Sequence, residues 1–167
     1  MGHVWLIGMM VSGKTTVGRI LAQRVERPFY DTDELVSLAG NASIPEIFSE
    51  EGESGFRVRE KSIVQDVASR PSGIVATGGG IILDPANVTT MRGSGTVVYL
   101  AADVDTLSRR LGAADDRPLL AVDRDQRLET ITSERSERYR SAADVIIDAG
   151  HSVDDVVADL EAVCSES

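Results

Sequence analysis

Near its N-terminus the chain reads Val4-Trp5-Leu6-Ile7-Gly8-Met9-Met10-Val11-Ser12-Gly13-Lys14-Thr15-Thr16. The four apolar residues predict a buried strand, and the loop that starts at Gly8 matches the pattern G-x-x-x-x-G-K-[ST]. Residues 15–25 then place apolar side chains at helical spacing. A strand, a glycine-rich loop and a helix in direct succession predict a phosphate-binding loop, because loop N–H groups and the start of the helix both attract anions.

The spacing of this loop suits a nucleoside triphosphate. Lys14 can reach the β- and γ-phosphates, and the Thr15 hydroxyl can ligate Mg²⁺. Val11 is β-branched and resists a positive φ, so we expect an ordinary backbone conformation there. A chance match in a glycine-rich turn is the alternative, and the flanking strand and helix argue against it. The sequence therefore predicts ATP and Mg²⁺ as cofactors, with nucleotide contacts from Met10, Val11, Ser12, Gly13, Lys14, Thr15 and Thr16.

Four more short apolar runs follow, at residues 28–31, 74–77, 96–100 and 144–147. Helical patterns separate them, which is typical of a parallel sheet covered by helices on both faces. Ser43 with Glu46 predicts a capping box, and Asp84-Pro85 predicts the start of another helix. Residues 123–140 are charged throughout and predict a largely exposed helix. We therefore predict a three-layer α/β/α fold with a five-stranded parallel sheet.

Length and charge limit the possible partners. The 167 residues suit a single domain, residues 1–167. The net charge of −10 disfavours nucleic acid and anionic membranes, because both repel an acidic surface. The single cysteine, Cys164, cannot form an internal disulfide, and the apolar start is too short for a membrane span. We expect a cytoplasmic monomer, with Cys164 and residues 165–167 as a frayed end.

Two predicted strands are followed by residues that could bind a phosphoryl acceptor. Asp31 and Asp33 stand at i and i+2 beyond the second strand, so they face the same cleft. Asp31 would lie near Mg²⁺ or its water shell, whereas Asp33 could take a proton from an acceptor hydroxyl. The alternative role of Asp33 is to cap a helix over residues 34–39. Three glycines at residues 78–80 let a ligand approach the backbone closely, unless they form only a flexible turn.

Three arginines are candidates for binding anions. Arg57 and Glu60 lie on one helix face, a spacing that most often indicates a surface ion pair. Arg117 lies in the polar segment 112–124, whose length suggests a lid that could close over the transferred phosphoryl group. Arg135 belongs to the charged helix, where a solvated position is the simplest expectation.

In combination these motifs resemble those of the shikimate kinase family, which are P-loop kinases of the nucleoside-monophosphate-kinase-like group. The resemblance rests on G-M-M-x-S-G-K-T-T-V-G at residues 8–18, D-T-D at 31–33, F-R-x-x-E at 56–60, G-G-G at 78–80, R-P-L-L at 117–120 and E-R-x-x-x-Y at 134–139. These motifs span nearly the whole chain. The resemblance implies a helical substrate-binding region at residues 33–60, a lid at 112–124 and ATP-dependent phosphorylation of the shikimate 3-hydroxyl, a step toward aromatic amino acids.

On the acceptor side, the resemblance implies roles for five residues. Asp33 would bind the ring hydroxyls of shikimate and act as the catalytic base. Arg57 and Arg135 would hold the substrate carboxylate. Gly79 and Gly80 would contact the substrate through their backbone.

On the nucleotide side, the resemblance implies that Lys14 and Arg117 act on the phosphates during transfer. Arg110 would pack against adenine, and Thr15 would bind Mg²⁺ with help from Asp31 through water. Val11 departs from the family, which usually has glycine there, and residues 149–153 show no close match to its adenine-contacting loop.

Two other functions stay open at this point. One is a kinase for another small carboxylated polyol such as gluconate, although the combination of Asp33, Arg57 and Arg135 favours a hydroxylated ring acid. The other is a nucleotide-binding regulatory domain that has lost catalysis.

Overall fold

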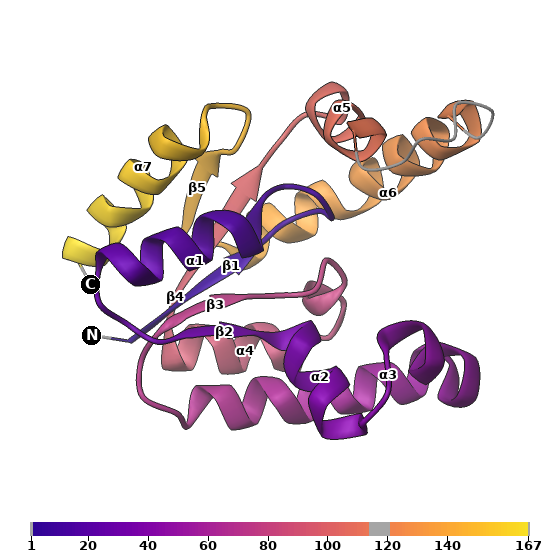
Figure 1. The fold of residues 1–167 in the computed structure, drawn as a ribbon, viewed down its shortest axis with the longest axis horizontal. Helices are drawn as coiled ribbons and strands as arrows, with labels where there is room; N and C mark the ends of the chain where they lie inside the picture. The colour runs from indigo at the N-terminus through magenta and orange to yellow at the C-terminus, as the bar shows by residue number, and fades with distance from the viewer. Residues whose placement is uncertain (1, 114–120, 167) are drawn as a thin grey trace.

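The structure is a computed structural model that describes residues 2–113 and 121–166. In this described part, the strands are β1 (His3–Ile7), β2 (Phe29–Asp31), β3 (Ile74–Ala76), β4 (Gly95–Ala101) and β5 (Val145–Asp148). They form a five-stranded sheet in the order β2-β3-β1-β4-β5, and every neighbouring pair is parallel (Figure 1). The predicted α/β fold with a five-stranded parallel sheet is confirmed.

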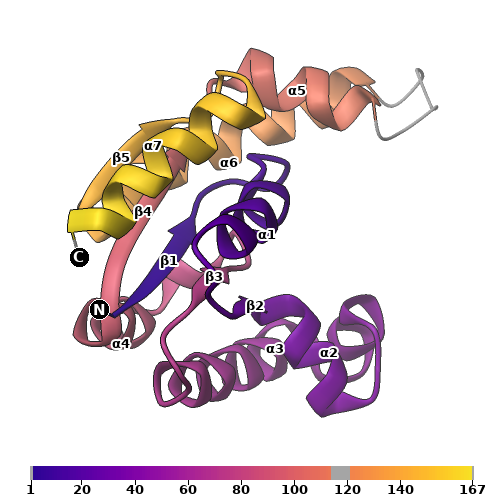
Figure 2. The same ribbon diagram turned by 60° about the vertical axis from the view of Figure 1, so that its left-hand side comes forward.

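Helices cover both faces of the sheet (Figures 1 and 2). They are α1 (Lys14–Arg24), α2 (Thr32–Gly40), α3 (Ile44–Ala68), α4 (Pro85–Ser94), α5 (Val104–Ala113), α6 (Ala121–Ala142) and α7 (Val153–Glu166), with a 3₁₀ turn η1 (Ile81–Leu83). One core cluster joins the sheet to α1 and α7, and a second joins its other face to α3, α4, α5 and α6. The molecule is thus the expected three-layer sandwich.

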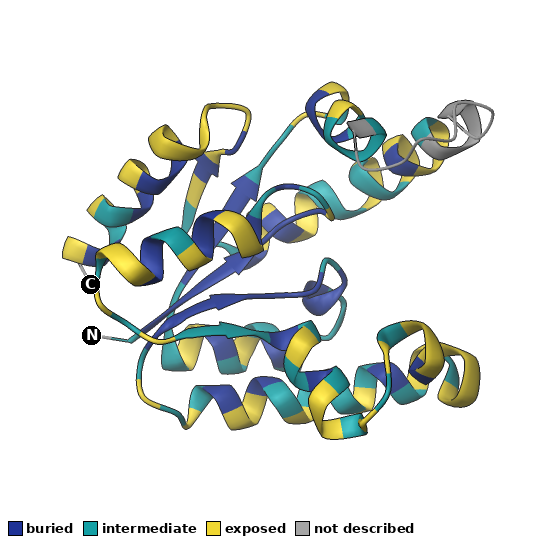
Figure 3. Ribbon diagram, viewed as in Figure 1, coloured by how far each residue is buried: buried dark blue, intermediate teal, exposed yellow. Residues whose placement is uncertain are grey.

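The central strand explains why this layering is stable. Every residue of β1 is buried, and its apolar side chains alternate between the two core clusters. Figure 3 shows the central strands as buried, whereas the outer sides of the helices are exposed. A continuous apolar run is what a parallel strand needs when both of its faces are covered.

The local signals at helix starts are also confirmed. Ser43 accepts a hydrogen bond from the Glu46 amide, and the Glu46 carboxylate accepts one from the Ser43 amide, which completes the capping box. Asp84 caps α4 through the Ala86 amide, and Pro85 occupies the first turn. Each signal satisfies amides that a helix start leaves without partners.

The structure refines one expectation about the C-terminal third and corrects another. Helix α6 is exposed along much of its length, but Leu128, Tyr139 and Ala142 are buried in the core. Cys164 is not part of a frayed end, because it lies on α7 and only 6% of its surface is exposed. The apolar residues of α7 are spaced to face α1 and the sheet, so the helix is held by packing.

Strand register brings three loops to one edge of the sheet. Ala76 of β3 pairs with Leu6 of β1 and with Asp31 of β2. The residues that follow these strands therefore emerge side by side, between the α2–α3 unit and the α5–α6 unit in both views (Figures 1 and 2). Among the described helices, none has the length and apolar character needed to cross a membrane.

Candidate active site

The loop after β1 is built around the amine of Lys14. The Lys14 Nζ donates to the carbonyl oxygens of Gly8 at 2.8 Å and Met9 at 2.7 Å, and lies 3.4 Å from the Ser12 hydroxyl. Burial lowers the pKa of Lys14 to about 8, against the opposing effect of Asp33 and Asp31. An anion in the loop would favour the charged amine, so this lysine is suited to a phosphate.

The start of α1 is open to an anion. Gly13 precedes the helix with φ at 101°. A glycine has no side chain that could cap the helix, so no capping side chain occupies the first amides of α1. Gly8 also has a positive φ, 148°. These two glycines allow the turn that aims backbone N–H groups at a phosphate.

Val11 contradicts the expectation of an ordinary backbone conformation. Its φ is 53°, in the left-handed region. That region costs about 1–2 kcal/mol for an L-residue, and β-branched residues are seldom found there. The strain is offset by packing, because the Val11 side chain contacts the core cluster that contains Met9 and Tyr139.

Thr15 and Asp31, the two residues predicted to bind a metal, lie in direct contact. The Thr15 hydroxyl donates to Asp31 Oδ2 at 2.9 Å, which joins the start of α1 to the end of β2. No three His, Cys, Asp or Glu residues of the described chain gather as a metal-binding group. This pair still suits Mg²⁺, which takes most of its ligands from water and phosphate.

Asp33 does not cap the helix after β2, so the alternative role considered for it is wrong. The cap is Asp31, whose Oδ1 accepts hydrogen bonds from the amides of Asp33 and Glu34. Asp33 Oδ1 is buried and has no hydrogen-bond partner. Burial and the nearby Asp31 carboxylate raise the pKa of Asp33, against the opposing charges of Lys14 and Arg57.

Arg57 and Glu60 form an ion pair in which Arg57 is half-buried and Glu60 is buried, where a surface pair was the usual expectation. Arg57 Nη1 lies 2.8 Å from Glu60 Oε2, and the Glu60 side chain is 1% exposed. Burial raises the pKa of Glu60, although Arg57 opposes this shift. Glu60 therefore fixes the guanidinium of Arg57 on the inner side of α3.

The three glycines after β3 make room for these charged groups. A side chain on Gly80 would overlap the Arg57 guanidinium. A Cβ on Gly78 would lie 2.8 Å from Asp33 Oδ1 and 3.2 Å from Glu60 Oε1. The loop is thus packed against charged side chains and is no flexible turn.

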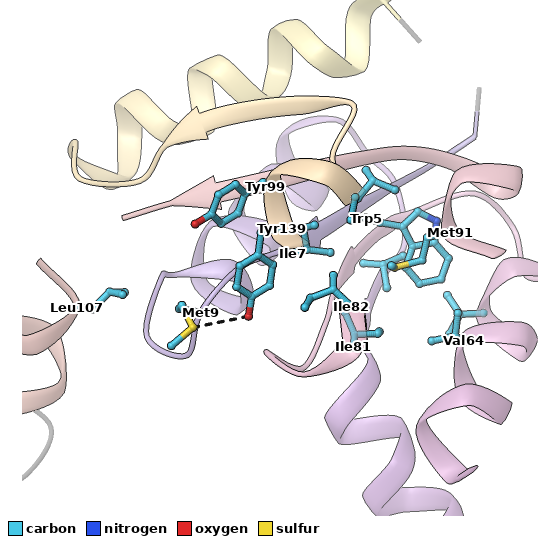
Figure 4. Close-up of a cluster of buried hydrophobic side chains, with 14 of the residues drawn as sticks. Trp5, Ile7, Met9, Val64, Ile81, Ile82, Met91, Tyr99, Leu107 and Tyr139 are labelled. Carbon is cyan, nitrogen blue, oxygen red and sulfur yellow. Dashed lines mark hydrogen bonds between the residues drawn. The ribbon is translucent and has the colours of Figure 1, made fainter. Parts of the chain in front are cut away.

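Arg135 and Tyr139 of α6 reach the same glycines from the other side. Arg135 Nη1 lies 3.4 Å from the Gly79 carbonyl oxygen, and the Tyr139 hydroxyl donates to that same oxygen. The Tyr139 hydroxyl also lies 3.7 Å from Met9 Sδ, a contact drawn in Figure 4. Arg135 is therefore no freely solvated residue of a charged helix.

A cavity of about 250 Å³ lies on the other side of the phosphate loop. Arg110 lies beside it and donates to the Ser12 carbonyl at 3.1 Å and to the Ala149 carbonyl at 2.6 Å. The cavity is lined by Val11, Ser12, Gly13, Thr16, Val17, Arg110, Ala149, His151, Val153 and Val156. This is where a base and ribose would lie if their phosphates entered the loop.

The sequence motifs contained three contributors whose structural role was not inferred. Thr32 is fully buried, and its hydroxyl accepts a hydrogen bond from the Gly78 amide at 3.2 Å. The sequence predicts Glu60 only as half of a surface pair and indicates no role for Tyr139. The sequence signal for these three residues was that each belongs to a motif with a residue of assigned role: Thr32 to D-T-D, Glu60 to F-R-x-x-E and Tyr139 to E-R-x-x-x-Y.

The structure thus brings together Asp33, Arg57 and Arg135 around the glycine loop. The phosphate loop lies next to them, because the Met10 amide nitrogen would be 3.5 Å from a Cβ on Gly79. Arg117 lies outside the described residues, as does most of the expected lid at 112–124. The assignment of these residues to nucleotide, metal or acceptor stays a prediction.

Comparison with known proteins gives a consistent result. The family model described as "Shikimate kinase" matches residues 10–164. A shikimate kinase of Nitrosospira multiformis is 41% identical over 150 residues, which are 89% of this chain and 77% of that protein.

Solved structures that resemble this chain include members of the same family and proteins that share only its fold. A shikimate kinase from Acinetobacter baumannii, in complex with shikimate, has a TM-score of 0.89 at 35% identity, over 100% of this chain and 95% of that one. A gluconokinase from Sinorhizobium meliloti has a TM-score of 0.61 at 16% identity, over 99% and 92% of the two chains, and shares the fold alone. The family model spans most of the chain and the Nitrosospira relative matches it at 41% identity, so this chain belongs to the shikimate kinase family.

Proposed function

We propose that this enzyme transfers the γ-phosphoryl group of ATP to the 3-hydroxyl of shikimate, giving shikimate 3-phosphate and ADP. The observation that carries the proposal is the arrangement around Gly78–Gly80. There a half-buried carboxylate (Asp33), whose Oδ1 is buried without a hydrogen-bond partner, and a guanidinium held by Glu60 (Arg57) lie against the backbone beside the phosphate loop. An acceptor that is both an acid and an alcohol matches these two groups.

On the donor side, ATP would place its phosphates in the loop around Lys14 and its base in the cavity beside Arg110. The Lys14 amine, already surrounded by loop carbonyls, would turn toward the β- and γ-phosphates. Thr15 and Asp31 would hold Mg²⁺, which would supply positive charge to offset the negative charge of the phosphates. Arg117 would contribute a further positive charge from the lid.

On the acceptor side, Arg57 and Arg135 would bind the carboxylate. Arginine suits this role because its planar fork donates two parallel hydrogen bonds to a carboxylate. Backbone N–H groups at Gly79 and Gly80 would add contacts that a side chain there would block. The ring would then present a hydroxyl to Asp33.

In the transfer step, Asp33 would accept the proton of the attacking hydroxyl as the new O–P bond forms and the bond to ADP breaks. Phosphoryl transfer needs little covalent help from a protein, so most of the effect would come from alignment and from the positive charges of Lys14 and Arg117. The raised pKa of Asp33 suits a base, since it makes the carboxylate a better proton acceptor.

The alternatives are less well supported. The gluconokinase shares only the fold, and a regulatory domain without catalysis would have no need of the buried, unpaired Oδ1 of Asp33. The expectations of a cytoplasmic monomer without nucleic-acid or membrane partners stay predictions.

A comparison of acceptors tests the function directly. ADP release, measured with shikimate, gluconate and quinate at equal concentration, should be rapid with shikimate and near background with gluconate. Turnover of gluconate without turnover of shikimate would show that the acceptor is wrong, and no turnover of any acid would favour the regulatory alternative.

Asp33→Asn should lower kcat by about 10²–10⁴-fold, because the variant cannot accept a proton. ADP affinity, measured by calorimetry, should change little. A parallel loss of ADP binding and turnover would instead assign Asp33 a structural role.

The raised pKa of Asp33 predicts two pH effects. The acidic limb of the wild-type kcat/KM profile should fall at a higher pH than an ordinary aspartate would give, and Asp33→Asn should lack that limb. A group whose folded-state pKa is raised destabilises the fold once it ionises. The variant should therefore unfold at a higher temperature than wild type at pH 7, and this difference should vanish below the pKa of an unfolded aspartate.

Arg57→Lys should raise the KM for shikimate by about tenfold and leave the KM for ATP unchanged, because lysine keeps the charge beside Glu60 but loses the planar fork. Arg59→Lys is the matched control, since Arg59 lies on the same helix and pairs with Glu51. Equal KM values for both variants and wild type would contradict a role of Arg57 in binding the carboxylate.

Val11→Gly should weaken ADP binding by about three- to tenfold, because it removes an apolar wall of the base cavity. Its unfolding free energy should stay within about 1 kcal/mol of wild type, since relief of the left-handed strain offsets the lost packing and the added chain freedom. Calorimetry and chemical unfolding measure the two quantities. Tighter ADP binding in the variant would show that Val11 narrows the cavity instead.

A further inference from the structure

Tyr139 is a core residue with a hydroxyl in the active site. Its side chain is fully buried, and its ring stacks on Tyr99 with 5.0 Å between centroids and 17° between ring planes. Figure 4 shows the ring beside Tyr99 with its hydroxyl directed at Met9. The ring fills the core as a phenylalanine would, so the hydroxyl needs a separate explanation.

The hydroxyl contacts one residue of each reactant loop. It donates to the Gly79 carbonyl and lies 3.7 Å from Met9 Sδ. Met9 belongs to the phosphate loop, and its own carbonyl accepts from Lys14. Tyr139 thereby contacts both the loop proposed for the phosphoryl donor and the loop proposed for the acceptor.

The bond to Gly79 also orients the next amide. A trans peptide is planar, with C=O and N–H on opposite sides. When the Gly79 carbonyl is held by α6, the Gly80 N–H must point away from α6. Gly80 is the residue against which the Arg57 guanidinium packs, so this amide belongs to the same anion-binding surface.

A second consequence concerns Arg135. Its guanidinium lies 3.4 Å from the Gly79 oxygen, at the long limit of a hydrogen bond. Because the Tyr139 hydroxyl already satisfies this carbonyl, Arg135 can turn to an incoming carboxylate without leaving a buried acceptor unpaired. Without the hydroxyl, Arg135 would be the only side chain of the described residues bonded to that oxygen.

We propose that Tyr139 is a positioning residue, whose hydroxyl holds the Gly79 carbonyl so that the Gly80 amide and the Arg135 guanidinium are both directed at the carboxylate of the acceptor. This inference rests on the proposed function, because it assumes an anionic acceptor at the glycine loop. Burial raises the pKa of Tyr139 to about 12, so the hydroxyl keeps its proton at neutral pH. The Tyr139 hydroxyl can therefore donate its hydrogen bond to the Gly79 carbonyl without interruption.

Tyr139→Phe tests the role of the hydroxyl, because it keeps the ring and its stacking. The KM for shikimate should rise by about three- to tenfold, as expected for the loss of one hydrogen bond. The KM for ATP should stay within twofold. Tyr99→Phe is the matched control, since it removes the hydroxyl of the stacked partner and should leave both KM values unchanged.

Two kinetic results would overturn the proposal. One is a shikimate KM within twofold of wild type in Tyr139→Phe. The other is an equal rise of both KM values together with a lower melting temperature, which would indicate only a weakened core.

A measurement without substrate keeps this inference separate from the proposed function. Loss of the hydrogen bond to the Gly79 carbonyl should depolarise that peptide and move the Gly80 amide nitrogen resonance upfield in Tyr139→Phe but not in Tyr99→Phe. An unchanged Gly80 resonance would contradict the tether. If wild type failed to phosphorylate shikimate, the proposed function would fall and the resonance would still report on the tether.

Discussion

The acceptor half of this site depends on the complete burial of one carboxylate. Glu60 has no exposed surface, so its charge must be compensated inside the protein, and Arg57 provides this at 2.8 Å. The pair fixes the guanidinium before any substrate arrives. With its position fixed, the neighbouring backbone must be glycine, because a Cβ on Gly80 would occupy the same space. Burial of the Glu60 carboxylate costs stability, but it orders the Arg57 guanidinium before an acceptor binds.

The two halves of the site are held together by the sheet and not by the loops themselves. Parallel pairing aligns the ends of β1, β2 and β3, and each loop then needs only a few residues to reach its neighbours. The Thr15–Asp31 and Thr32–Gly78 hydrogen bonds join the first loop to the second and the second to the third. Lys14, Arg57 and Arg135 are thereby brought to one edge of the sheet in a molecule of net charge −10, so two anionic reactants would meet cationic side chains there.

The fold, and the gathering of the predicted residues at one edge of the sheet, were predictable from sequence because their signals are local. A strand followed by a glycine-rich loop, a capping box or a proline in a first turn is determined within a few residues, and each was confirmed. Burial and side-chain direction depend on distant partners, so the spacing of Arg57 and Glu60 indicated a surface pair, and the charged sequence of α6 concealed Tyr139. Helix α7 was missed for the same reason, since its short apolar stripe is meaningful only against α1 and the sheet.

Val11 shows how far local preference can be overridden. The conformational cost of a left-handed β-branched residue led us to expect an ordinary backbone at Val11, yet its φ is 53°. The loop cannot relax this residue alone, because Gly8 and Gly13 already fix the turn and the carbonyls beside them hold the Lys14 amine. Strain of about 1–2 kcal/mol is small against a buried cluster that contains Met9 and Tyr139. The phosphate loop is therefore held in shape by the core beneath it, and the same core orients the glycine loop.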